Sequence, residues 1–248
     1  MHIGKYKIAD LVVEMETIYP AVHYLCADYR CPDDTPADIS VHMTEALIDA
    51  EQTKSREEAL LEGRVPTEHH PGYLETLAVY RQMSKIMILE HDILLFHGSA
   101  IAVDNRAVLF TAKSGTGKST HTALWREMLG ERCYMVNDDK PLLRVREDLT
   151  EVCGTPWNGK HNLGTNCIVP LKAICILERG EDNRIEELQA KDVLPMLLQQ
   201  SFRPDNPKTM LKLLKVIDKM AQNVKFYRLQ CNMDPEAARI SYEAMLGE

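Results

Sequence analysis

Apolar and polar residues in the first part of the chain follow two different periods. KYKIADLVVEMET and ADISVHMTEA alternate as strands do, and CADYRCPDDTPAD between them is rich in turn-forming Pro and Asp. Residues 43–62 are rich in Ala, Glu and Leu, which favours a helix. Apolar side chains recur at helical spacing from Leu74 to Met87 and predict a second helix over residues 72–89. The front of the chain is therefore expected to form a small α+β lobe.

From Leu94 onwards the pattern changes to short apolar runs separated by turns. LLFHGSAIAV and AVLFTA, with the turn DNR between them, predict a β-hairpin. After the loop KSGTG we expect a helix that ends at a Gly130 cap. Its apolar face would consist of Leu124, Trp125, Met128 and Leu129. Further strands are predicted at CYMV, PLLRVRED, TEVC, LKAICILE and VKFYRLQC, and further helices at about residues 190–201 and 207–222 and from Pro235.

This change of pattern predicts two parts, an N-terminal lobe over residues 1–93 and a second domain over residues 94–248. Charge is divided in a similar way. Residues 1–96 hold 8 Lys and Arg against 17 Asp and Glu, whereas residues 97–248 hold 21 against 20. A net charge of -8 argues against a nucleic-acid partner, which normally requires a basic face. The nearly neutral second part can accept an anionic nucleotide without strong repulsion.

Composition also bears on where the protein works. No run of about 18 apolar residues occurs, and acidic residues interrupt the start of the chain, so we expect neither a membrane span nor a signal peptide. The seven cysteines include no CxxC pair, which predicts neither a disulfide framework nor a zinc site. The simplest expectation is a cytoplasmic protein.

The segment AKSGTGKST fits the pattern of a phosphate-binding loop, with Ala112 in place of the first glycine. Glycines let backbone N–H groups turn towards phosphate oxygens, and the positive end of the following helix adds to the attraction. Lys118 would neutralise the β and γ phosphates, and Ser119 would offer its hydroxyl to Mg²⁺. A strand before the segment and an amphipathic helix after it favour this interpretation over an accidental Gly-rich turn. The residues expected to bind the nucleotide are Ser114, Gly115, Thr116, Gly117, Lys118, Ser119 and Thr120.

Two adjacent acids, Asp138 and Asp139, end the predicted CYMV strand. In a phosphate-loop protein this is where a carboxylate directed at Mg²⁺ belongs. One acid could act on a substrate hydroxyl and the other on metal-bound water. Taken alone, the pair would fit a solvated turn, but the loop 20 residues upstream favours a functional role.

Three other features are less specific. His97 would by itself be read as a hydrogen-bonded core residue. The long polar segment GTPWNGKHNLGTN, residues 154–166, fits either a functional loop, with Lys160 on a phosphate and Trp157 as a wall, or a surface excursion with a packed tryptophan. Arg203 lies between two predicted helices and would either stabilise charge during transfer or be solvated.

HGSAIAV, AKSGTGKST and VNDD, in this order and spacing, resemble the catalytic domain of the HPr serine kinase/phosphorylase family. That domain is similar in fold to the nucleotide-binding part of phosphoenolpyruvate carboxykinase. The resemblance covers residues 94–180 and implies an α/β fold whose core is a mixed β-sheet with a phosphate-binding loop, often assembled into homo-oligomers. It implies transfer of phosphate from ATP, with Mg²⁺, to a hydroxyl.

Matched residue by residue, the resemblance makes His97 the active-site histidine, Asp138 the general base and Asp139 a metal-associated acid beside Ser119. Arg203 echoes the family's C-terminal arginine signature. The chain departs from the pattern after the acid pair, where PWNGKHN replaces a glutamate-bearing signature, and the front lobe does not resemble the usual N-terminal domain. HPr itself is therefore not the expected acceptor.

Three functions follow, and the sequence leaves them open. The leading one is a Mg²⁺-dependent kinase acting on a serine of a protein or peptide, or on a small alcohol. A carboxykinase-like enzyme would need a substrate-clamping arginine that the acidic front lobe, with four arginines, does not obviously supply. A nucleotide-sensing switch without turnover would explain the altered loop at residues 154–166. The absence of an NKxD motif favours ATP over GTP.

Overall fold

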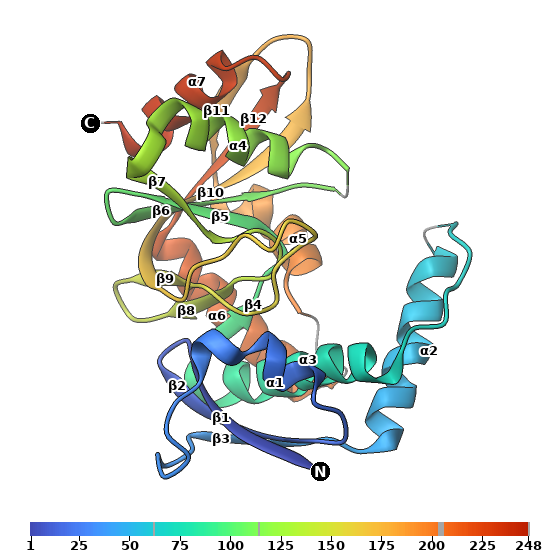
Figure 1. Ribbon diagram of the computed structural model, residues 1–248. Helices are drawn as coiled ribbons and strands as arrows, with labels where there is room; N and C mark the ends of the chain where they lie inside the picture. Colours follow the sequence, from blue (N-terminus) through green and yellow to red (C-terminus); the bar gives the residue numbers. More distant parts are fainter. Residues whose placement is uncertain (62, 114, 203–205, 248) are drawn as a thin grey trace. The chain divides into compact units, whose positions relative to one another are not determined.

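The computed structural model describes residues 1–61, 63–113, 115–202 and 206–247 (Figure 1). The chain divides into two compact units, Met1–Ile86 and Met87–Glu248, and the division falls within one long helix, α3 (Pro71–His91). The pattern of the sequence had placed the change seven residues later, between residues 93 and 94. Each unit has its own sheet.

The first unit is built on a three-stranded sheet in the order β1-β2-β3. Strands β1 (His2–Ile8) and β2 (Leu11–Thr17) form an antiparallel hairpin, and β3 (Ile39–His42) runs parallel to β2. KYKIADLVVEMET is thus two strands rather than one. Ala9 and Asp10 have φ of 52° and 70°, the left-handed conformations of a tight hairpin turn, which the sequence does not signal with glycine.

The first unit also contains helices. They are α1 (Ala21–Leu25), a 3₁₀ turn at Ala27–Tyr29, α2 (Glu45–Leu61) and the first part of α3. The helices predicted over residues 43–62 and 72–89 are confirmed within a few residues. The buried Glu75 of α3 accepts hydrogen bonds from the backbone N–H groups of Ile18 (2.6 Å) and Tyr19 (2.8 Å), which fixes the chain after β2.

In the second unit, the described residues form one mixed sheet of nine strands. Seven follow the order β4-β8-β9-β10-β6-β5-β7, β12 pairs with β10, and β11 pairs with β12. The central β10 runs parallel to β6 and β12 and antiparallel to β9. The strands are β4 (Ile93–Leu95), β5 (Ser99–Val103), β6 (Arg106–Thr111), β7 (Cys133–Asn137), β8 (Leu142–Val145), β9 (Thr150–Cys153), β10 (Ile168–Arg179), β11 (Arg184–Leu188) and β12 (Lys225–Cys231).

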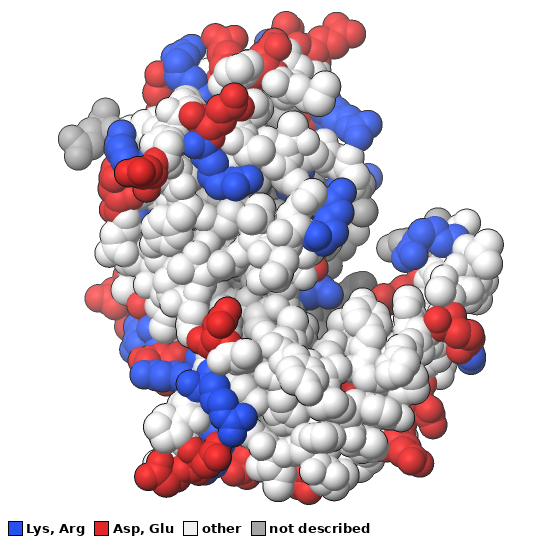
Figure 2. Space-filling model, viewed as in Figure 1, with Lys and Arg blue, Asp and Glu red and all other residues white. Residues whose placement is uncertain are grey.

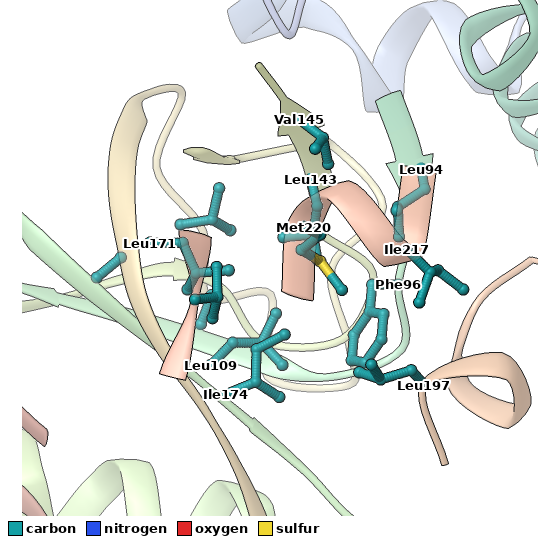
Figure 3. Close-up of a cluster of buried hydrophobic side chains, with 14 of the residues drawn as sticks. Leu94, Phe96, Leu109, Leu143, Val145, Leu171, Ile174, Leu197, Ile217 and Met220 are labelled. Carbon is teal, nitrogen blue, oxygen red and sulfur yellow. The ribbon is translucent and has the colours of Figure 1, made fainter. Parts of the chain in front are cut away.

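The helices that begin in the described part of this unit are α4 (Lys118–Leu129), α5 (Ala190–Gln200), α6 (Pro207–Asn223) and α7 (Glu236–Leu246), with a 3₁₀ turn at Gly130–Arg132. Helices α5 and α6 pack on one face of the sheet, in a core that includes Leu109 and Ile174 (Figure 3). On the other face, α4 and α7 pack on Phe110 and Cys175. Neighbouring residues of a strand point to opposite faces, so the central strands read as continuous apolar runs.

Most predicted elements of this unit are confirmed, including the β5–β6 hairpin and the cap at Gly130, whose φ is 58°. One was wrong. LLFHGSAIAV is not one strand, because β4 pairs with β8 and the chain leaves the sheet before β5 begins at Ser99. His97 therefore lies between strands rather than on one. The strand predicted at LKAICILE is confirmed as part of β10, which begins at Ile168, where its first residues pair with β9.

Basic and acidic side chains are interspersed over the face shown in Figure 2. Within the described residues, the helices are all too short or too polar to cross a membrane.

Candidate functional site

Two glycines in the loop between β6 and α4 have backbone conformations that favour glycine. Gly115 has φ of 77° and Gly117 has φ of 123°, and an added Cβ at either would meet no atom within 4 Å. The glycines are thus required by backbone conformation rather than by crowding. Ala112 is not among the described residues with positive φ, so alanine replaces the first glycine of the pattern without strain.

One arginine outside the sequence motif holds this loop. Arg179, at the end of β10, donates hydrogen bonds to the carbonyl oxygens of Gly115 (2.5 Å) and Thr116 (3.5 Å). In a trans peptide the carbonyl and the following N–H point in opposite directions. Arg179 on the Thr116 carbonyl therefore turns the N–H of Gly117 away from itself, as a backbone that donates to phosphate oxygens requires.

The loop borders a pocket of about 470 Å³ that gathers most of the predicted site. Gly115–Thr120 form one side, and His97, Asp138 and Asp139 form the other. Gly159, Lys160 and His161 of the long loop also line it. Ser114 and Arg203 lie outside the described residues. Each remaining residue that the sequence assigned to catalysis, nucleotide or metal thus borders this one pocket.

One oxygen of the Asp138 carboxylate accepts a hydrogen bond from the backbone of the long loop. The residue is 8% exposed, and its Oδ1 accepts a hydrogen bond of 2.6 Å from the N–H of Gly159. A Cβ on Gly159 would lie 3.2 Å from Asp138 Oδ2 and 3.3 Å from Asp139 Cβ, which is a tight contact. Glycine at this position lets the loop backbone approach both acids.

Asp139 faces positive charge. His97 Nε2 lies 3.3 Å from its Oδ1, and Lys140 Nζ lies 3.8 Å from its Oδ2. Burial would raise the pKa of Asp139, but the hydrogen bond from His97 and the charges of Lys140, His97 and Lys118 outweigh it and lower the pKa. Burial lowers the pKa of Lys118, against the attraction of Asp139. The site thus keeps a carboxylate next to a lysine that is partly removed from water.

His97 is fixed through its backbone. Its N–H donates to the carbonyl of Gln200 (2.8 Å), and its carbonyl accepts from the hydroxyl of Thr111 (3.0 Å). The N–H of Gly98 donates to the carbonyl of Asp139 (3.0 Å). Because a Cβ on Gly98 would lie 2.6 Å from Leu109 Cδ2 and 2.9 Å from a backbone oxygen, glycine is required here.

Asn137 is the functional residue whose role the sequence did not reveal. It is completely buried, and its Oδ1 accepts from the N–H groups of Asp139 (2.9 Å) and Lys140 (2.6 Å). Its Nδ2 lies within hydrogen-bonding distance of Thr155 (3.1 Å) and Asn158 (3.0 Å). One amide therefore joins the turn of the two acids to the long loop. Only its position directly before the acids would have pointed to it.

The long loop, residues 154–166, has one feature of each interpretation that the sequence left open: side chains that line the pocket and a packed tryptophan. Its Lys160 and His161 line the pocket, whereas Trp157 is 4% exposed and is packed rather than forming a pocket wall. Thr165 fastens the far end of the loop to β7 through the carbonyls of Met135 (2.8 Å) and Val136 (3.1 Å).

A second pocket, of about 520 Å³, follows the first two turns of α4. Thr120, His121 and Leu124 line it from the helix, and Leu177 and Met233 line it from the sheet side. It shares Gly115–Gly117 with the first pocket. Apolar side chains next to a phosphate cradle can accept the nucleoside part of a nucleotide.

The residues present fit a nucleotide-bound Mg²⁺ rather than an independent metal site. The part of the chain that the structure describes contains no group of three or more His, Cys, Asp or Glu side chains placed to hold a metal ion. Mg²⁺ is commonly held by one or two carboxylates together with substrate phosphates. Ser119 and Asp139, on the same pocket as the cradle, meet that requirement.

Comparisons with known proteins identify no family for this chain. No protein-family model and no curated protein matches the chain. Among solved structures, the HPr(Ser) kinase/phosphatase from Coxiella burnetii matches with a TM-score of 0.34 and 12% identity. The match covers 60% of this chain and 93% of that one. Similarity at this level says nothing about activity, so function has to be inferred from the site.

Replacing Asn137 with Ala should destabilise the protein by about 2–4 kcal/mol, because it leaves several buried backbone and side-chain groups without partners. Urea unfolding of the two proteins measures the difference. Asn223→Ala is the matched control, since Asn223 makes only exposed bonds of 3.3 Å to two carbonyls, and we expect it to change stability by less than about 0.5 kcal/mol. Equal stabilities for the two variants would contradict the role given to Asn137.

Replacing Arg179 with Gln should weaken binding of an ATP analogue by about fivefold to thirtyfold, because the loop loses the donor that orients its peptides. Fluorescence titration measures the affinity. Arg184→Gln, an exposed change on β11, is the control and should bind as the unaltered protein does. Unchanged affinity in Arg179→Gln would show that the loop keeps its shape without the arginine.

Proposed function

We propose that the second unit is a Mg²⁺-dependent kinase that transfers the γ-phosphoryl group of ATP to an alcohol. The observation that supports this most is that one pocket is lined by the glycine loop, by Lys118 and by two carboxylates, Asp138 and Asp139. The two carboxylates differ in their hydrogen-bond and charge partners. A binding module needs the cradle and the lysine. A buried, oriented carboxylate opposite the cradle is what a transferase needs in addition.

The two carboxylates divide the work. Asp138 has one oxygen occupied by the N–H of Gly159, which leaves the other to take the proton of the acceptor hydroxyl. As that proton moves to Asp138, the acceptor oxygen bonds to the γ phosphorus, the bond to the β–γ bridging oxygen breaks, and ADP leaves. Asp139 is engaged by His97 and Lys140 and is kept as the anion.

The remaining residues position and neutralise. Lys118 and the N–H groups at the start of α4 face the phosphates and offset the charge that develops on them. Ser119 and Asp139 would hold a nucleotide-bound Mg²⁺, which would supply positive charge against the phosphates. His97 holds Asp139 in place from beside it, with Nε2 3.3 Å from Oδ1. The resemblance of the sequence to the HPr kinase family supports the same assignment, including ATP as donor and a serine or small alcohol as acceptor.

Asp138→Asn should lower phosphoryl transfer by about 10²–10⁴-fold while nucleotide binding is retained, because the amide keeps the shape but takes no proton. The assay is label transfer from γ-labelled ATP into a host extract separated into macromolecular and small-molecule fractions. Lys118→Ala serves as the control that should lose both binding and transfer. Transfer by Asp138→Asn at the unaltered rate would remove Asp138 as the base.

The same assay separates the alternatives. Label in a protein or peptide supports a serine kinase, and label in a small metabolite supports a metabolite kinase. Label on a keto acid would favour a carboxykinase-like reaction. Tight nucleotide binding without Lys118-dependent label in any fraction would replace the kinase proposal with a nucleotide-sensing switch.

A further inference from the structure

A third pocket, of about 590 Å³, lies between the phosphate loop and α5. Lys113, Thr116 and Arg179 line it from the loop side. Asp192, Met196 and Gln199 line it from the helix. The nucleotide-site assignments above leave this space without an occupant.

This pocket adjoins the pocket of the two acids. Gln200 lines it, and the carbonyl of Gln200 accepts the N–H of His97, which lines the pocket of the two acids. Thr116 borders all three pockets. Because the nucleoside is expected along α4, the space on the α5 side remains for the second substrate.

Within the described part of the chain, some charged side chains around the pocket have hydrogen-bond or ion-pair partners and others do not. Arg179 is bound to loop carbonyls, and Arg228 lies between Glu178 (3.2 Å) and Glu186 (3.0 Å). Asp192, exposed in the first turn of α5, has no ion-pair partner among the described residues. Lys113 lies next to the cradle, where a bound triphosphate would offset its charge.

We propose that this pocket receives the acceptor of the transfer, whose hydroxyl reaches the adjoining pocket that Asp138 lines, and that Asp192 makes it select an acceptor with a cationic group. The inference rests on the proposed function. With the nucleotide bound, the triphosphate offsets the positive charges of Lys113 and Arg179, and Asp192 remains as a carboxylate without an ion-pair partner among the described residues. An anionic acceptor is then repelled and an amine or guanidinium is attracted. Ile176, Leu177 and Met196 contribute an apolar lining for the carbon skeleton of the acceptor.

The test measures binding first and transfer separately. The probes are two short fluorescein-labelled peptides with one serine, flanked by lysines in one and by glutamates in the other. Their anisotropy is followed on full-length protein saturated with a non-hydrolysable ATP analogue. The variants are Asp192→Lys, which reverses the charge, and Gln199→Trp, which fills the pocket. Leu194→Trp is the matched control, because it adds an indole to an exposed position of α5 that does not line the pocket.

We expect the lysine peptide to bind more tightly than the glutamate peptide. Asp192→Lys should weaken the lysine peptide by about threefold to fivefold or more. Gln199→Trp should abolish binding of this peptide, whereas Leu194→Trp should bind it as the unaltered protein does, and all variants should keep their affinity for the ATP analogue. Equal binding of both peptides, equal binding by the two tryptophan variants, or binding of neither peptide overturns the assignment.

Two further measurements distinguish a small amino alcohol from a peptide as the acceptor, and test the kinase proposal separately from the pocket. Displacement of the lysine peptide by serinamide or ethanolamine at comparable concentration supports a small amino alcohol, and resistance to both supports a peptide. Replacing the analogue with γ-labelled ATP then tests transfer. Binding with the expected variant pattern but without transfer overturns the kinase proposal and leaves the pocket as a ligand site. Transfer that is unchanged in Gln199→Trp overturns the pocket and leaves the kinase.

Discussion

The site depends on strand direction within one sheet. Strands β6 and β10 run parallel, with Thr111 paired to Ile176, so the phosphate loop and Arg179 leave the sheet at the same edge. Strand β5 runs antiparallel to both β6 and β7, with Ala100 paired to Leu109 and Asn137. Its first residues therefore lie where β6 and β7 end. The loop, the histidine and the acids meet because β6, β7 and β10 end, and β5 begins, at the same edge of the sheet.

A second constraint is that charged groups taken partly out of water must find partners. Lys118 and Asp139 lower each other's electrostatic cost, and His97 and Lys140 hold the carboxylate from other directions. Asn137 adds hydrogen bonds that fix the backbone of the same turn. Such a network is strong only when all members are satisfied, so the geometry of the acids is inseparable from the packing of the long loop.

The sequence predicted what is local in the chain. A glycine-rich loop between an apolar strand and an amphipathic helix has a local signature, and so do acids directly after a buried strand. Arg179 was not predicted, because it is more than 60 residues from the loop that it holds and becomes its neighbour only through the pairing of β10 with β6. Strand β11 was missed because its side chains are largely exposed and show no apolar alternation.

The long loop contacts the two acids through its backbone and lines the pocket with its side chains. Asp138 is held by the backbone N–H of Gly159, and the acids' turn is held by the amide of Asn137, so neither contact uses the side chains of Lys160 or His161. Those two side chains line the pocket without orienting its acids. They can therefore change without loss of these contacts, whereas a Cβ at Gly159 would lie 3.2 Å from Asp138 Oδ2 and 3.3 Å from Asp139 Cβ, so that the acids would have to shift. PWNGKHN, where the sequence departs from the pattern that it otherwise resembles, lies in this loop, so the departure changes the lining of the pocket and leaves the backbone contacts to the acids in place.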